Sequence, residues 1–295
     1  MSTPLRIAAF LAALAAVFGV AVAVGNTVGP VAPAEEGAEA GHGDGHASEG
    51  AAPTNEIPGG LMIAQDGYTF RLDDPSKRPG RAVPVSFTIT GPDGEPVTEY
   101  DVEHEKKLHL IAVRRDFAGF QHVHPRLAAD GTWSTDLDLT PGQWRLFADF
   151  TATGAHGLTL GADLSVSGRH EPAHDDVETR TATVDGYTVT LDGDLRAGAD
   201  AKLTLRVERD GEPVTDLEPY LGAYGHLVAL REGDLAYLHV HPDGTPGDGS
   251  TEPGPEVVFF AAVPSDGAYR LFLDFKHEGK VRTAAFAVGA GDHGH

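Results

Sequence analysis

The stretch KLHLIAVRRDFAGFQHVHP runs from Lys107 to Pro125, and GHLVALREGDLAYLHVHP runs from Gly225 to Pro242. These are two copies of one pattern. In each copy an early histidine lies in an apolar run, and a His-x-His-Pro segment begins 13 residues later. The apolar runs flank turn-type sequences, at residues 114–119 in the first copy and 231–234 in the second. Each copy is therefore predicted to form a strand, a tight turn and a second strand.

Strand periodicity predicts how the histidines of each copy lie. Side chains alternate between the faces of a strand, so the two histidines of His-x-His point the same way, roughly 7 Å apart. Folding the hairpin about its turn places His109 opposite His124 and His226 opposite His241, on a shared face. A one-residue slip would move the first histidine to the other face. In this register each hairpin gathers three imidazoles: His109, His122 and His124 in the first copy, and His226, His239 and His241 in the second.

The repetition extends well beyond the hairpins. Three further motifs recur in the same order: residues 66–69 (DGYT) at 185–188, residues 93–98 (DGEPVT) at 210–215, and residues 144–150 (WRLFADF) at 269–275 (YRLFLDF). An internal duplication with a period of roughly 110 residues explains this order. Short alternating strands separated by turns, without a helical period, are typical of antiparallel sandwiches. The predicted fold class is all-β: two tandem Ig-like antiparallel β-sandwich domains after an N-terminal helix.

Composition divides the chain into six predicted segments. They are a signal anchor or signal peptide (1–24), a disordered Ala/Gly/Glu/His linker (25–58), sandwich repeat 1 (59–168), a linker (169–180), sandwich repeat 2 (181–289) and a His-containing tail (290–295). His42 and His46 of the first linker and His293 and His295 of the tail could capture metal weakly, or serve only as polar filler.

The N-terminal segment indicates export. Ile7–Val24 is apolar and uncharged, Arg6 precedes it, and no further Lys or Arg occurs before Arg71. This asymmetry places the N-terminus in the cytoplasm and the rest outside. Ala21-Val22-Ala23 resembles a signal-peptide cleavage site, whereas an apolar run of about 18 residues nearly spans a bilayer and slightly favours an uncleaved anchor. We expect a single-pass cell-membrane protein with its C-terminal domains outside, or a secreted one if the leader is cleaved.

Charge and cysteine content exclude several classes of protein. The formal net charge is −22, and a nucleic-acid partner needs a basic surface. The chain has no cysteine, which excludes disulfides, thiolate metal sites, blue-copper sites and a lipid-modified cysteine anchor. The sequence contains no Gly-x-Ser-x-Gly, phosphate loop or His-Glu-x-x-His, so we expect no enzymatic activity.

The histidine clusters indicate a metal site. Neutral imidazole is a common ligand of late divalent metals, and the affinity order favours Cu(II), with Zn(II) second. His156 and His277 follow the strands that contain Asp149 and Asp274, so each could be a fourth ligand. The two aspartates could instead fix an imidazole tautomer.

Two other interpretations stay open. Histidines on a half-apolar strand are often hydrogen-bonded structural residues, and the recurrence could be inherited from one duplicated structural site. The chain would then be a non-catalytic scaffold that contacts another envelope protein. Neighbouring imidazoles also titrate near neutrality and could form a pH switch.

A resemblance supports the metal interpretation. Residues 219–242 contain PYLGAYGHLV and YLHVHP, and this segment resembles a PY(M/L)G…GH…H(L/V)HP motif of poorly characterised exported bacterial proteins. The resemblance implies β-sandwich modules that are sometimes associated with copper or other heavy-metal handling. The first copy keeps its three histidines but has EHEKK at residues 103–107 in place of the Tyr-Leu-Gly-Ala segment. We therefore expect an extracytoplasmic protein that stores, scavenges or delivers a copper-like divalent ion.

Overall fold

A computed structural model describes residues 57–173 and 178–291 of the chain. Its strands are β1 (Ala64–Gln65), β2 (Tyr68–Leu72), β3 (Ser76–Lys77), β4 (Gly80–Thr90), β5 (Leu108–Arg114), β6 (Gln121–Val123), β7 (Arg126–Leu127), β8 (Thr132–Leu139), β9 (Gly142–Phe150), β10 (Leu158–Val166), β11 (Thr181–Val184), β12 (Tyr187–Asp192), β13 (Asp200–Arg209), β14 (Glu212–Pro213), β15 (His226–Arg231), β16 (Val240–Pro242), β17 (Glu256–Ala262), β18 (Gly267–His277) and β19 (Lys280–Ala290). Within these ranges no helix is both long and apolar enough to cross a membrane.

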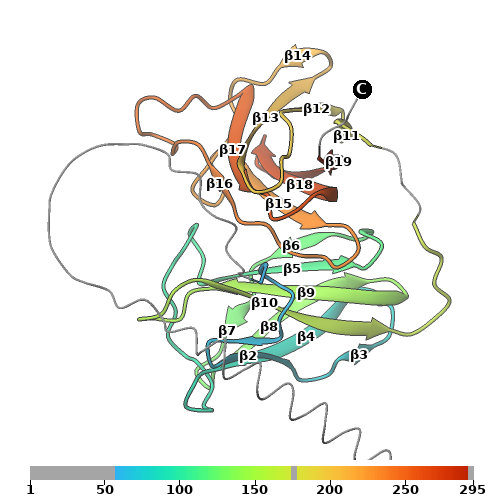
Figure 1. The fold of residues 1–295 in the computed structure, drawn as a ribbon, viewed down its shortest axis with the longest axis vertical. Helices are drawn as coiled ribbons and strands as arrows, with labels where there is room; N and C mark the ends of the chain where they lie inside the picture. The colour runs from blue at the N-terminus through green and yellow to red at the C-terminus, as the bar shows by residue number, and fades with distance from the viewer. Residues whose placement is uncertain (1–56, 174–177, 292–295) are drawn as a thin grey trace, which may run out of the picture. The chain divides into compact units, whose positions relative to one another are not determined.

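The first repeat is a sandwich of two five-stranded sheets (Figure 1). One sheet has the strand order β1-β2-β4-β8-β7 and the other β3-β10-β9-β5-β6. Alternate residues of β9, among them Trp144, Leu146 and Ala148, enter the core between the sheets. Phe70, Phe87 and Ile89, which are fully buried, enter that core too.

The second repeat is built in the same way. A sheet of order β11-β12-β13-β17-β16, with β14 paired to β13, covers a three-stranded sheet of order β15-β18-β19. Its core contains Tyr269, Leu271 and Leu273 of β18, at the positions that match Trp144, Leu146 and Ala148. The predicted all-β tandem of sandwiches is confirmed. The predicted anchor or signal peptide (1–24), most of the linker 25–58 and the tail histidines lie outside the described residues.

A third apolar cluster joins the outer faces of the two sandwiches. It contains Ile111, Val113 and Phe147 of the first repeat and Val228, Leu230, Leu235 and Phe272 of the second. Strands β5 and β15 are therefore buried on both faces, because Leu110 and Ala229, one residue away, enter the repeats' own cores. This packing decides what surrounds the histidines, since His109 and His226 lie on the same outer faces.

A short segment before β1 contacts both repeats. The Gly59 carbonyl accepts a hydrogen bond from Tyr237 N (2.9 Å), and Gly60 N donates to Thr159 O (2.7 Å). Arg145 donates to the Gly60 carbonyl through Nη2 (2.6 Å) and pairs with Asp163 through Nη1 (3.0 Å). The buried side chain of Arg145 thus holds the segment before β1 in place beside the interface between the repeats.

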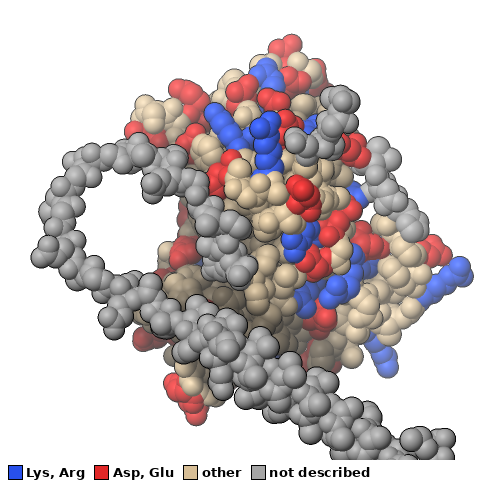
Figure 2. All heavy atoms as spheres, in the orientation of Figure 1, with Lys and Arg blue, Asp and Glu red and all other residues tan. Residues whose placement is uncertain are grey.

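The surface carries mixed charge. On the face shown in Figure 2, acidic and basic side chains are interspersed. Several arginines pair with acids at short distances, for example Arg231 with Asp234 (2.5 Å) and Arg270 with Glu232 (2.6 Å). Because acidic residues outnumber basic ones in the sequence, these ion pairs neutralise only part of the negative charge.

Candidate metal centre

The β5–β6 hairpin places the three histidines of the first repeat on one face. Leu110 pairs with Val123 and Ile111 with His122, so the next opposed pair along the ladder is His109 and His124. His122 lies two residues from His124 and shares its face. The register predicted for this hairpin is confirmed, and this face is the one that the second repeat covers.

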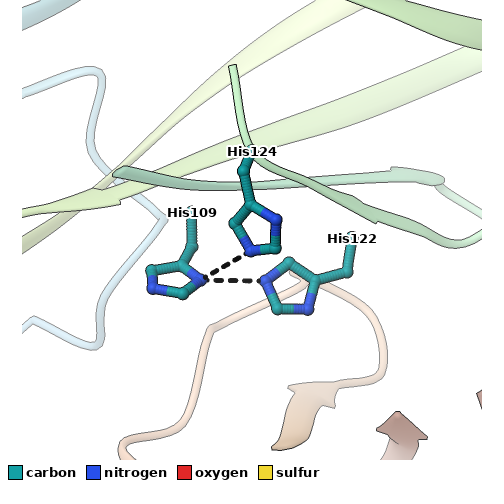
Figure 3. A group of neighbouring side chains, drawn as sticks. All are labelled: His109, His122 and His124. Atoms are coloured by element: carbon teal, nitrogen blue, oxygen red, sulfur yellow. Dashed lines mark hydrogen bonds between the residues drawn. The ribbon is translucent and has the colours of Figure 1, made fainter. Parts of the chain in front are cut away.

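The imidazole nitrogens of this hairpin converge. Nδ1 of His109 lies 3.0 Å from Nε2 of His122 and 3.2 Å from Nε2 of His124 (Figure 3). One ligand atom from each ring lies within 4.8 Å of the others, and no second group of three potential ligands lies in residues 57–173 and 178–291. We call His109, His122 and His124 the histidine triad.

The outer nitrogens of two triad rings have acceptors that determine the tautomers. Nε2 of His109 lies 3.2 Å from the Glu103 carbonyl oxygen, which can only accept, so this nitrogen carries the proton. Nδ1 of His122 donates to Oδ2 of Asp274 across 2.9 Å. In neutral rings the remaining nitrogens, Nδ1 of His109 and Nε2 of His122, are then both unprotonated. When both rings are neutral, these two lone pairs face each other across 3.0 Å, and a proton on either nitrogen turns the contact into a hydrogen bond.

The His122–Asp274 pair is buried and joins the repeats. The two side chains are 1% and 4% exposed. Oδ1 of Asp274 accepts a further hydrogen bond from Thr283 Oγ1 (2.5 Å), so both carboxylate oxygens are used. Carboxylates in this position orient metal-binding histidines in many proteins. Asp274 thus has the orienting geometry that the sequence indicated as one alternative, but it acts on a histidine of the other repeat.

Burial favours the neutral form of two triad rings, His109 and His124. Desolvation, followed by the neighbouring His122, lowers the pKa of His109 to about 4. The same two causes, in the same order, lower the pKa of His124 to about 3. Rings that stay neutral well below pH 7 keep their lone pairs available for a metal ion without competition from protons.

His226 of the second repeat lies beside the triad. Its ring centre is 4.8 Å from that of His122 and 5.5 Å from that of His109, and it stacks on His109 with an interplanar angle of 6°. His104, an exposed residue before β5, lies 5.7 Å from His226. Burial and then the triad histidines lower the pKa of His226 well below its ordinary value. Sequence reasoning grouped His226 with its own repeat and missed this neighbourhood.

The other two histidines of the second repeat are arranged differently from the first copy. His241 pairs with Phe260 of β17, not with His226, because β16 belongs to the opposite sheet. The predicted pairing of His226 with His241 is therefore wrong. A single bridge, Leu230 to Tyr237, keeps the expected hairpin register near the turn. His239 and His241 are exposed, with ring centres 5.9 Å apart.

The candidate fourth ligands lie in networks of their own. His156 pairs with Asp66 (3.1 Å) at the surface. His277 is buried between the Tyr187 hydroxyl (2.7 Å) and Asp216 (3.0 Å). Neither network includes a residue of the triad. Asp149 accepts a hydrogen bond from Thr159 (3.0 Å), and burial raises the pKa of its carboxyl group.

The sequence did hold a signal for the interface. Residues 110–113 (LIAV) and 227–230 (LVAL) are continuous apolar runs, whereas a strand with one solvated face alternates. Such runs indicate strands covered on both faces. The outer face of β5, which contains His109, therefore had to meet another part of the protein.

Fold and site together define a tandem β-sandwich protein with a three-histidine cluster at the junction of its repeats. The chain belongs to the family described as a domain of unknown function (DUF8832), whose model matches it twice, over residues 63–166 and 182–292. The two matches coincide with the two sandwiches. No curated protein matches the chain.

Solved structures share a coarse likeness with the chain. The Escherichia coli adhesin FdeC is 12% identical over 78% of this chain and 66% of its own, with a TM-score of 0.26. The Yersinia pseudotuberculosis adhesin InvE is 12% identical over 77% and 60%, with a TM-score of 0.23. A putative membrane-anchored protein from Corynebacterium diphtheriae is 11% identical over 77% and 59%, also with a TM-score of 0.23. The match thus leaves a third or more of each of these chains uncovered, and the function has to be argued from this chain's own residues.

Proposed function

We propose that this protein binds a divalent late transition-metal ion at the histidine triad, on the outer side of a bacterial membrane. Cu(II) is the preferred ion and Zn(II) the second. The protein stores, scavenges or delivers the ion and catalyses no reaction. The leader-like segment 1–24 and the lack of cysteine support the location and the imidazole-only chemistry.

The convergence of one ring nitrogen each from His109, His122 and His124 is the observation that carries this proposal. Glu103 and Asp274 hold protons on the outer nitrogens of His109 and His122, so the inner nitrogens carry bare lone pairs when both rings are neutral. His124 can relieve one of them by donating from Nε2 to His109, which still leaves the His122 lone pair without a proton. A cation that replaces the Nε2 proton of His124, which moves to Nδ1, accepts a lone pair from all three rings at once, since metal–nitrogen bonds are about 2.0–2.1 Å long.

A purely structural role for the histidines accounts for less of this geometry. Structural histidines normally donate and accept hydrogen bonds with complementary partners. Here the outer nitrogens of His109 and His122 have hydrogen-bond acceptors, while the inner nitrogens of the triad converge within 4.8 Å. The interaction-scaffold alternative explains the apolar faces, but it needs an added proton to pair the inner nitrogens of His109 and His122 with each other.

The test is a calorimetric titration of the metal-free full-length chain, in detergent, with Cu(II) and Zn(II). The variant His122→Ala/His124→Ala removes two of the three ligands. We expect its affinity for the tightest site to fall at least about 100-fold, because losing even an orienting partner costs 10- to 100-fold. The matched control is His239→Ala/His241→Ala, which removes the corresponding, exposed pair of the second repeat.

The control should keep the tight site, and weak binding by the histidines of the linker and tail is common to all three proteins. Equal affinity in the wild type and the His122→Ala/His124→Ala variant would exclude the triad as the site. Loss of the tight site in the control alone would move the site to the second repeat.

A further inference from the structure

We infer that the ion held by the triad also binds His226, so that the centre is a four-imidazole site built from both repeats. This inference rests on the proposed function. It adds a ligand from the second repeat and a consequence: the metal ion links the two sandwiches.

The ring distances fit a shared ion. Two imidazoles bound to one ion through bonds of about 2.0–2.1 Å have ring centres about 5 Å apart. Within the triad the centre-to-centre distances are 5.3, 5.0 and 4.9 Å. The distances from His226 to His122 and His109, 4.8 and 5.5 Å, fall in the same range. By this measure His226 is about as close to His109 and His122 as the triad rings are to one another, although its nitrogens are not part of the group that converges within 4.8 Å.

The polar atoms of the His226 ring are free to take a ligand role. Ring contacts link His226 to other histidines, but no hydrogen bond joins its imidazole to another residue of the described ranges. Neither ring nitrogen of His226 is therefore committed to a protein acceptor, and either can turn to a ligand. A rotation about its side-chain torsions is enough to turn a ring nitrogen towards the triad.

The second repeat delivers two groups to the site from adjacent strands. His226 on β15 pairs directly with Asp274 on β18, and directly opposed residues share a face. Asp274 holds the outer nitrogen of His122, while the His226 ring contacts the His122 ring at a centre distance of 4.8 Å. One directly opposed pair of residues thus supplies both the carboxylate that orients His122 and the additional imidazole ligand.

Four nitrogen ligands make a closed centre. A closed tetrahedral site is typical of structural zinc, and a tetragonal arrangement of nitrogens suits Cu(II). Both fit an ion that is held and not an ion that activates water. Because the ligands come from both repeats, the binding energy contributes to repeat docking, and the ion should stabilise the docked form.

The test compares full-length His226→Ala and His226→Gln with the matched variant His241→Ala, an exposed histidine of the same repeat. Each is titrated with Cu(II) and Zn(II), and the Cu(II) complexes are examined by electron paramagnetic resonance for coupled nitrogens. We expect both His226 variants to bind on the order of 10-fold or more weaker and to lose one coupled nitrogen. The Gln variant keeps a side chain of similar length, so a packing defect in the Ala variant cannot produce the result alone.

The outcomes separate this inference from the proposed function. Wild-type affinity and an unchanged nitrogen count in the His226 variants would overturn the four-imidazole site while leaving the triad intact. Absence of tight binding in the wild type would overturn both. Equal losses in His226→Ala and His241→Ala would also contradict the inference, because the effect would then not be specific to the junction.

Discussion

At the scale of single residues, the site depends on hydrogen-bond acceptors that are not themselves ligands. The Glu103 carbonyl and the Asp274 carboxylate each hold the outer nitrogen of one triad ring. They differ in origin, since Glu103 precedes β5 in the first repeat and Asp274 lies in β18 of the second. One acceptor is therefore supplied locally, and the other is present only when the repeats are docked.

Asp274→Asn tests the orienting role. The substitution keeps the shape but removes the charge, and the amide NH₂ can then face His122 and force the ring proton onto the inner nitrogen. We expect Cu(II) or Zn(II) affinity to fall about 10- to 100-fold, measured by titration against a competing chelator. The matched control is Asp216→Asn, which changes the carboxylate 3.0 Å from Nε2 of His277, outside the triad.

The control should bind metal as the wild type does. Equal effects of the two substitutions would contradict the assignment of Asp274 as the partner that orients His122.

At the scale of elements, strand alternation and turn sequence were enough to predict the triad. The residues between His109 and His122 form one tight hairpin, and the predicted opposition of His109 and His124 follows from its length. The same 13-residue spacing did not predict the pairing in the second copy. There the chain separates from β15 after the Leu230–Tyr237 bridge, and the next strand, β16, pairs with β17. Which sheet a three-residue strand joins depends on tertiary contacts that local periodicity does not encode.

The β5–β6 turn gives a prediction at this scale. Gly119 has φ +69°, and a Cβ there would lie 2.6 Å from Cη2 of the fully buried Trp144. Gly119→Ala should cost about 2–4 kcal/mol of unfolding free energy, from backbone strain and overpacking together. It should also weaken metal binding, because β6, which contains His122, begins two residues later. Urea unfolding and metal titration measure the two effects.

Gly233→Ala in the β15–β16 turn is the matched control. Gly233 also has positive φ (+94°), but no atom lies within 4 Å of the position that a Cβ would take there. We expect a cost of about 1 kcal/mol from strain alone and unchanged metal affinity. If both glycine variants behaved alike, contact with Trp144 would not be what holds the turn.

At the scale of the whole molecule, the duplication forms a pseudo-symmetric pair. Phe120 stacks on Phe272 with ring centres 4.0 Å apart, and Tyr237 packs on Phe147 at 5.7 Å. In the aligned copies Phe120 corresponds to Tyr237 and Phe147 to Phe272, so the two contacts are one contact exchanged between repeats. This reciprocity is the mark of an isologous interface. His109 and His226, also equivalent, stack on each other. The sequence revealed the duplication, but a repeated pattern alone does not say that the copies pack face to face.

Symmetry in the backbone is not matched by symmetry in the site. His122 and His124 lie in the triad, whereas their counterparts His239 and His241 are exposed on the opposite sheet. Because His109 and His226 stack on each other at the interface, the two repeats share one candidate metal site there and do not form one each. The first repeat therefore supplies most of the ligands, and the second supplies docking, orientation and one further imidazole.

Phe272→Ala tests whether docking and metal binding are coupled. Phe272 is 5% exposed and lies between the repeats, so its loss should lower the unfolding free energy by about 3–5 kcal/mol. It should also loosen the docking of His226 and Asp274 against the triad. The metal affinity of Phe272→Ala should therefore be no higher than that of His226→Ala.

The matched control is Phe286→Ala, which removes a phenyl ring from the interior of the second repeat (2% exposed). It should cost a similar free energy while the folded protein keeps its affinity. Urea unfolding and Zn(II) titration below the unfolding transition, with small-angle scattering to follow separation of the repeats, measure these outcomes. Undiminished affinity in folded Phe272→Ala would mean that the triad binds its ion without the second repeat.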